Sequence, residues 1–173
     1  MNREQATFAG GCFWCLQGPF DAEPGVTNVE VGYVGGSQAD AVYATVASGT
    51  TNHREGIHMT YDPNTVTYQR LLDIFWKQID PTDVGGQFAD RGHQYTTAIY
   101  YHTEEQYQWA EVSKQQLEQS GKFKVPIATV IVPFISFFPA EADHQAYYKK
   151  RPLQYQMYKR GSGRADFIKK NWT

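Results

Sequence analysis

The sequence is short of cysteine, of net charge and of long apolar runs, and each shortage excludes a class of protein. Its 173 residues contain only two cysteines, Cys12 and Cys15, so no disulfide framework can hold distant segments together. Lys and Arg total 16 against 18 Asp and Glu, which argues against a nucleic-acid-binding or polybasic membrane protein. No run of about 18 apolar residues occurs, so no membrane-spanning helix is expected. The first residues also lack the apolar core of a signal peptide, and a cytoplasmic location is expected.

The composition is that of a folded protein. Apolar residues reach 41% and the net charge is only -2, which argues against disorder. The length suits one domain, and no repeat, low-complexity tract or Pro/Gly/Ser linker divides the chain. We therefore expect a single domain over residues 1–173. Residues 151–173, which include Gly161-Ser162-Gly163, are expected to form a mostly irregular tail packed on it.

Hydrophobic periodicity predicts both strands and helices. Strand patterns of alternating, β-branched or aromatic residues cover residues 7–9, 29–33, 56–61, 96–102 and 127–132. Helical patterns cover a segment from about Cys12 to before Pro24, residues 68–79 and residues 103–119. The irregular alternation of the two favours an α+β fold, a two-layer α/β sandwich with a mixed or antiparallel sheet.

The two cysteines lie too close together to act as a structural staple, because so short a loop removes little entropy from the unfolded chain. Residues 7–15 are typical of a strand, a tight turn at Gly10-Gly11 and a helix start. Cys12 is expected in the first turn of that helix, where unpaired backbone N–H groups and the helix dipole stabilise a thiolate and lower its pKa. Cys15 lies one turn further on the same face, placed to attack whatever forms on the first sulfur.

Several interpretations of the pair are open. Two small buried apolar residues on a helix is the plain structural one. A C-x-x-C pair more often indicates redox chemistry, and a thioredoxin-type dithiol–disulfide oxidoreductase is one alternative. Phe13 and Trp14 between the cysteines, however, suit the binding of a small apolar group. A zinc-bearing binding module is another alternative, but it would have to recruit two of the five histidines, of which only His53 and His58 are closely spaced.

The hexapeptide Gly10-Gly11-Cys12-Phe13-Trp14-Cys15 resembles the signature of the A-type peptide-methionine sulfoxide reductases, which act on the S epimer. Further blocks similar to that family follow in order at residues 32–36, 43–55, 85–95 and 143–152. The resemblance runs from about Phe8 to Tyr158. It implies an α+β two-layer core, ferredoxin-like, with long irregular loops. It also implies reduction of methionine-S-sulfoxide, free or in proteins, as repair of oxidative damage.

The resemblance assigns roles to seven residues. Cys12 would be the nucleophile, Glu55 the acid, Tyr43 and Tyr95 hydrogen-bond donors to the sulfoxide oxygen, Phe13 and Trp14 the holders of the substrate methyl group, and Asp90 a positioning group. The chemistry needs such residue types, because attack on sulfur places charge on oxygen and a neutral acid must supply a proton. A free glutamic acid has a pKa of about 4.3, so burial would have to raise it.

The expected sequence of steps uses both cysteines. Attack by Cys12 leaves a sulfenic acid, which Cys15 converts to a disulfide. An external dithiol, by resemblance thioredoxin and in vitro dithiothreitol, then restores both thiols. Many family members carry glycine in place of Cys15 and recycle through cysteines near the C-terminus, which this chain lacks. We expect no metal and no bound cofactor, a monomer, and as partners only methionine sulfoxide and thioredoxin, with no nucleic acid and no membrane.

Overall fold

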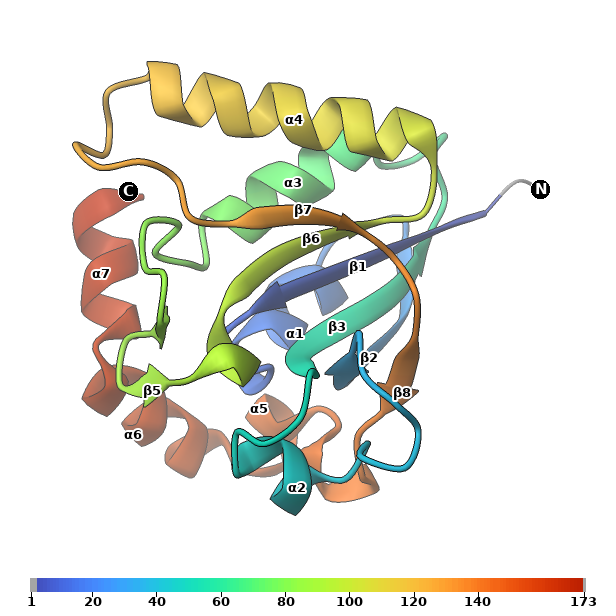
Figure 1. Cartoon of the computed structure of the whole chain (residues 1–173), viewed down its shortest axis with the longest axis vertical. Coiled ribbons are helices and arrows are strands. Elements are labelled where there is room, and N and C mark those ends of the chain that lie inside the picture. Colours follow the sequence, from blue (N-terminus) through green and yellow to red (C-terminus); the bar gives the residue numbers. More distant parts are fainter. Residues whose placement is uncertain (1–2, 173) are drawn as a thin grey trace.

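A computed structural model describes residues 3–172 as helices packed on a six-stranded mixed sheet (Figure 1). The sheet has the order β7-β6-β1-β3-β2-β8, in which only the β6–β7 pair is parallel. Its strands are β1 (Glu4–Gly10), β2 (Val26–Val34), β3 (Arg54–Tyr61), β6 (Thr97–Tyr101), β7 (Val130–Pro133) and β8 (Phe137–Pro139). A separate ribbon pairs β4 (Gly86–Gln87) with β5 (Asp90–Arg91).

Seven α-helices occur in the described part of the chain. They are α1 (Trp14–Asp21), α2 (Tyr43–Ala47), α3 (Tyr68–Trp76), α4 (Glu104–Gln119), α5 (Tyr147–Lys150), α6 (Pro152–Ser162) and α7 (Arg164–Asn171), with single 3-10 turns at η1 (His93–Tyr95) and η2 (Ala142–His144). The expected α+β fold with a mixed sheet is confirmed, whereas the ferredoxin-like description of its core stays a prediction. Between residues 3 and 172, no helix is both long and apolar enough to cross a membrane.

The main core lies between the sheet and helices α1 and α3, and Phe8 of β1 stands at its centre. The Phe8 ring stacks at 5.6 Å on Phe20 of α1 and at 5.0 Å on Phe75 of α3, measured between ring centroids. Side chains alternate along a strand, so the next residue, Ala9, faces the other side of the sheet. There it packs in a smaller cluster against which Phe137 is laid. Core packing therefore fixes β1 from both faces.

The predicted helices over residues 68–79 and 103–119 are confirmed as α3 and α4, although α3 ends at Trp76. Each helix has a threonine as its N-cap residue, whose hydroxyl accepts a hydrogen bond from the backbone N–H three residues further on. Thr67 accepts from Arg70, and Thr103 accepts from Gln106. The predicted strand over residues 127–132 is shorter than expected, because β7 begins at Val130.

The expectation of a mostly irregular tail over residues 151–173 is wrong. Residues 152–162 and 164–171 form α6 and α7, while Thr173 lies outside the described residues. Pro152 occupies the first helical position, where its missing N–H costs nothing, and Gly163 adopts φ +97° between the two helices. Leu153 and Met157 are 69% and 66% exposed and Tyr155 is the one buried residue of α6, so the helix has no broad buried apolar face. The single domain over residues 1–173 remains a prediction.

The central position of Phe8 leads to a stability prediction. Phe8→Ala should lower the free energy of unfolding by about 3–5 kcal/mol, because it leaves a cavity against three stacked rings. Urea denaturation followed by circular dichroism measures the loss. Leu153→Ala, at an exposed site, is the control and should change stability by no more than about 0.5 kcal/mol. Equal losses in the two variants would contradict the assignment of the core.

Candidate active site

The two cysteines lie at the junction between β1 and α1. β1 ends at Gly10, the chain turns through Gly11 at φ +86°, and Phe13 is the residue that precedes the first turn of α1. Cys12 therefore stands just before the helix and not within its first turn. The N–H of Cys15 donates to the carbonyl oxygen of Cys12 at 3.2 Å, which places the two residues one turn apart. Both are free thiols, with Cys12 only 6% exposed and Cys15 fully buried.

The turn at Gly11 is held from two sides. A Cβ atom on Gly11 would lie 2.6 Å from the Gln87 Cβ and 2.6 Å from the Arg164 Nη2. Gln87 is itself fixed, since its side-chain amide accepts from the Asp80 N–H at 2.9 Å and donates to the Asp80 carbonyl at 2.7 Å. Only glycine meets both the backbone angle and the space, so this clamp sets the path of the chain into Cys12.

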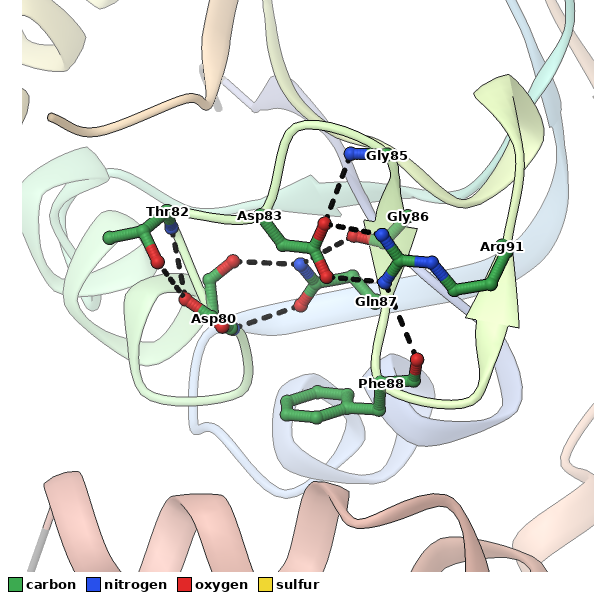
Figure 2. A network of polar contacts seen from close by, with 8 residues as sticks. All are labelled: Asp80, Thr82, Asp83, Gly85, Gly86, Gln87, Phe88 and Arg91. Carbon is green, nitrogen blue, oxygen red and sulfur yellow. Dashed lines mark hydrogen bonds and ion pairs between the residues drawn. The ribbon is translucent and has the colours of Figure 1, made fainter. Parts of the chain in front are cut away.

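Asp90 lies opposite Gln87 in the antiparallel β4–β5 pair. Figure 2 shows the polar contacts that hold the loop around Gln87. Arg91 forms a two-pronged ion pair with Asp83, with Nη2 at 2.8 Å from Oδ1, and the Asp83 carboxylate also accepts from the Gly85 N–H. Arg91 is thus paired with Asp83 and leaves its sequence neighbour Asp90 free to accept a hydrogen bond from the Tyr158 hydroxyl of α6. This network stiffens the loop that carries Asp90 to the site.

Glu55 of β3 lies beside the cysteine turn and is 1% exposed. The Phe13 N–H donates to its Oε1 at 3.3 Å, while Oε2 has no hydrogen-bond partner among residues 3–172. Burial raises the pKa of Glu55 to about 8, opposed by the Phe13 hydrogen bond and reinforced by the charge of Asp90. The carboxyl group is therefore largely protonated at neutral pH, as the sequence-based expectation of a neutral acid required.

The expected lowering of the Cys12 pKa is wrong. Burial raises the pKa of this thiol well above its ordinary value, the charges of Glu55 and Cys15 raise it further, and the main opposing contribution is a hydrogen bond from the Trp14 N–H. Removal of the sulfur from water thus outweighs the favourable end of an eight-residue helix. In the resting protein Cys12 is a thiol.

An aromatic wall surrounds the turn. The ring of Phe13 is fully buried, with its centroid 5.9 Å from that of Tyr33 and 5.6 Å from that of His144. Trp14 stacks on Tyr147 at 4.1 Å with an interplanar angle of 11°, and its Nε1–H donates to His144 Nδ1 at 3.1 Å. The half-exposed Trp14 ring is therefore held in one orientation beside Cys12.

Tyr43 of α2 and Tyr95 of η1 complete the surroundings. Burial first, and then the charge of Glu55, raise the pKa of the Tyr43 hydroxyl to about 12, and the same two causes raise the pKa of Tyr95. The charge of Cys12 acts on both hydroxyls as well. Both groups consequently keep their protons and remain hydrogen-bond donors. The structure brings together all eight residues that the sequence singled out.

Sequence reasoning missed several groups that border the site. His144 lies between Trp14 and Tyr43, whose ring it stacks on at 4.3 Å. Glu141 accepts from the Tyr33 hydroxyl at 2.6 Å and from the Tyr43 N–H at 3.1 Å. The block at residues 143–152 was the available signal for the first of these. Tyr147 and Tyr158, in the C-terminal segment, also contact Trp14.

The hydrogen bonds of His53 define the role of this buried histidine. His53 accepts from the Gly36 N–H at Nδ1 (3.1 Å), so its Nε2 carries the proton and donates to the Ser37 carbonyl at 2.7 Å. With both nitrogens engaged, His53 holds the turn at Gly36 and Ser37. From residue 3 to residue 172, no three His, Cys, Asp or Glu side chains gather in a way that could hold a metal ion.

The close packing around Gly11 predicts that adding a methyl group at this position lowers the stability of the fold. Gly11→Ala should destabilise the fold by about 1–3 kcal/mol more than Gly121→Ala, because the new Cβ overlaps Gln87 and Arg164. Gly121 is a matched control: it also has a positive φ, +71°, but nothing lies within 4 Å of its added Cβ. Urea denaturation of both variants measures the difference. Equal losses would show that the two side chains do not restrain the turn.

Comparisons with known proteins agree with this geometry. The family model described as peptide methionine sulfoxide reductase matches residues 4–173. The peptide methionine sulfoxide reductase MsrA of Bacillus licheniformis is 53% identical over 99% of this chain and 94% of its own length. Reduced Mxr1 from Saccharomyces cerevisiae superimposes with a TM-score of 0.79 at 30% identity, covering 87% of each chain.

A second structure of the yeast protein, Mxr1 in complex with Trx2, is 23% identical with a TM-score of 0.55 over 84% of each chain, and it supports the fold alone. These matches favour neither a thioredoxin-type oxidoreductase nor a zinc module. A match over nearly the whole length and an identity of one half are far beyond what a shared fold requires. The chain belongs to the peptide methionine sulfoxide reductase family.

Proposed function

We propose that this protein reduces methionine-S-sulfoxide, free or in proteins, to methionine at the expense of thiols. The observation that carries the proposal is the buried carboxyl of Glu55 beside Cys12, protonated at neutral pH and with Oε2 unpartnered within the described part of the chain. An unpartnered buried acid next to a nucleophile is suited to an oxygen that arrives with the substrate.

The first step joins Cys12 to the substrate sulfur. The sulfoxide oxygen accepts hydrogen bonds from the Tyr43 and Tyr95 hydroxyls and the proton of Glu55, which disperse the charge that attack places on oxygen. Binding of this polar group beside the thiol also offsets the burial that holds the pKa of Cys12 high. The bond between Cys12 and the substrate sulfur then breaks as the protonated oxygen passes to the Cys12 sulfur. Methionine leaves as the thioether, reduced by two electrons, and Cys12, oxidised by two electrons, becomes a sulfenic acid.

The aromatic wall supplies the recognition of the substrate. Phe13 and Trp14 hold the methyl group beside the polar S–O bond, and Asp90 fixes the side of the site formed by Tyr158. An apolar contact of one methyl contributes about 1–3 kcal/mol of discrimination. The S epimer is the one that the family resemblance implies.

The second step uses Cys15, which condenses with the sulfenic acid to a disulfide and releases water. Two thiols supply the two electrons that the sulfoxide takes up, so the reaction balances without a bound cofactor. We infer that thioredoxin reduces the disulfide, in keeping with the family and with the complex formed by Mxr1 and Trx2. A cytoplasmic monomer remains the prediction from the sequence.

A change at Cys15 separates the two steps. Cys15→Ser should release about one methionine per enzyme and then stall with thioredoxin as reductant, because the sulfenic acid has no internal partner. Cys12→Ser should release none. Chromatographic measurement of methionine against enzyme concentration checks both. Sustained thioredoxin-driven turnover by the Cys15→Ser variant would remove Cys15 from the cycle.

A change at Glu55 tests the acid. Since its pKa is raised to about 8, the proton is present below that pH and is lost as the pH rises through it, so the single-turnover rate should fall there. Glu55→Gln keeps the volume and a hydrogen-bond donor but cannot transfer a proton. It should slow methionine release by about 10²–10⁴-fold and lack the fall near that pH, in rapid-quench measurements. A single-turnover rate and pH profile equal to those of the parent would reassign the acid.

A further inference from the structure

The C-terminal helices lie near the end of β1 (Figure 1). There the guanidinium of Arg164 donates a hydrogen bond to the Gly10 carbonyl. We propose that Arg164 of α7, with Tyr155 of α6, activates Cys15 for disulfide formation by favouring its thiolate. This inference rests on the proposed function and assigns the tail a task in its second step. Arg164 acts as a positioning and electrostatic residue, and Tyr155 as a hydroxyl group that favours the Cys15 thiolate.

Arg164 is a buried cation with an unusual set of partners. It is 1% exposed, and its guanidinium donates from Nη1 to the Gln78 carbonyl at 2.6 Å and from Nη2 to the Gly10 carbonyl at 2.9 Å. Its third neighbour is the ring of Phe88, 4.9 Å from Cζ. Across residues 3–172 it forms no ion pair with a carboxylate. A buried charge without a counter-ion is costly, so an anion formed nearby is strongly favoured.

The nearby group that can become an anion is Cys15. Burial raises the pKa of this thiol, and the largest opposing contribution is the charge of Arg164, followed by that of Lys159. Asp90 opposes the thiolate, while a hydrogen bond from the Tyr155 hydroxyl supports it. The ionisable groups that face Cys15 are thus Cys12, Asp90, Tyr155, Tyr158, Lys159 and Arg164. Three of the four that come from the tail favour the thiolate.

The guanidinium of Arg164 lies close to the segment that contains both cysteines. Its Nη2 is bound to the carbonyl of Gly10 and would meet a Cβ on Gly11 at 2.6 Å, so the guanidinium lies against the turn that leads into Cys12. Cys15 sits one helical turn beyond. One rigid cation therefore stands beside the short segment across which the disulfide must form.

The step that Arg164 assists balances within the protein. Cys15 loses its proton, and its thiolate attacks the Cys12 sulfur of the sulfenic acid. The S–S bond forms, the S–O bond breaks, and the oxygen leaves as hydroxide, which takes up a proton to become water. Cys15 is oxidised and Cys12 is reduced, so no further oxidant is needed.

The experiment uses the full chain, fully reduced and mixed with one equivalent of methionine-S-sulfoxide without reductant. Methionine release, with the loss of one of the two free thiols, reports the first step, and the loss of the remaining thiol reports the second. For Arg164→Gln we expect the ratio of the second rate to the first to fall by about tenfold near neutral pH, because fewer molecules carry the Cys15 thiolate, and to recover at alkaline pH. Arg164→Lys, which keeps the charge, should restore most of the ratio.

Arg160→Gln removes an exposed charge from the same tail and is the control, with both rates expected to equal those of the parent. Equal effects of Arg164→Gln and Arg164→Lys would overturn the proposal, because they would reveal only a structural clamp. An unchanged ratio and pH profile in Arg164→Gln would overturn it as well. If Arg164→Gln does not fold, Tyr155→Phe decides: thiol loss equal to that of the parent at every pH contradicts the activation of Cys15 by the tail. A parent that releases no methionine contradicts the proposed function instead.

Discussion

Removal of ionisable groups from water at the end of β1 is the constraint on which the site depends. Burial keeps Glu55 protonated, keeps Cys12 a thiol, and keeps Tyr43 and Tyr95 as hydroxyls. The resting site is thus rich in protons and poor in charge. A sulfoxide, whose oxygen accepts hydrogen bonds and gains charge in the reaction, complements such a site better than an anion or a metal ion would.

The scaffold makes this burial possible by holding the cysteine turn without help from solvent. β1 is anchored by Phe8 in the main core, and it ends at a turn that only glycine can occupy between Gln87 and Arg164. Gln87 is fixed in turn by the loop around Asp80. Stiff support of this kind keeps Cys12 and Glu55 aligned, because neither side chain could be exposed or displaced without disrupting packed neighbours.

The two cysteines have different surroundings, and the difference matches a division of labour. Cys12 faces an acid, two tyrosines and the aromatic wall, whereas Cys15 faces cationic and hydroxyl groups of the tail. The first environment suits the binding and protonation of an oxygen. The second suits the formation of a thiolate. A tail without cysteine can therefore still assist the recycling of Cys12, because its charged groups favour the thiolate of Cys15.

The sequence by itself determined the α+β class, α3, α4 and most of the sheet strands, because local periodicity and threonine caps act over a few residues. It also indicated the chemistry, since the cysteine pair and the ordered blocks place the chain in its family. Only the tertiary structure decided that the Cys12 pKa is raised rather than lowered, because desolvation depends on what packs over a residue. It also decided that the tail is helical and that Arg164, 154 positions from Gly10, lies against the cysteine turn. Contacts between segments so far apart leave no local pattern, and the packing of the whole chain creates them.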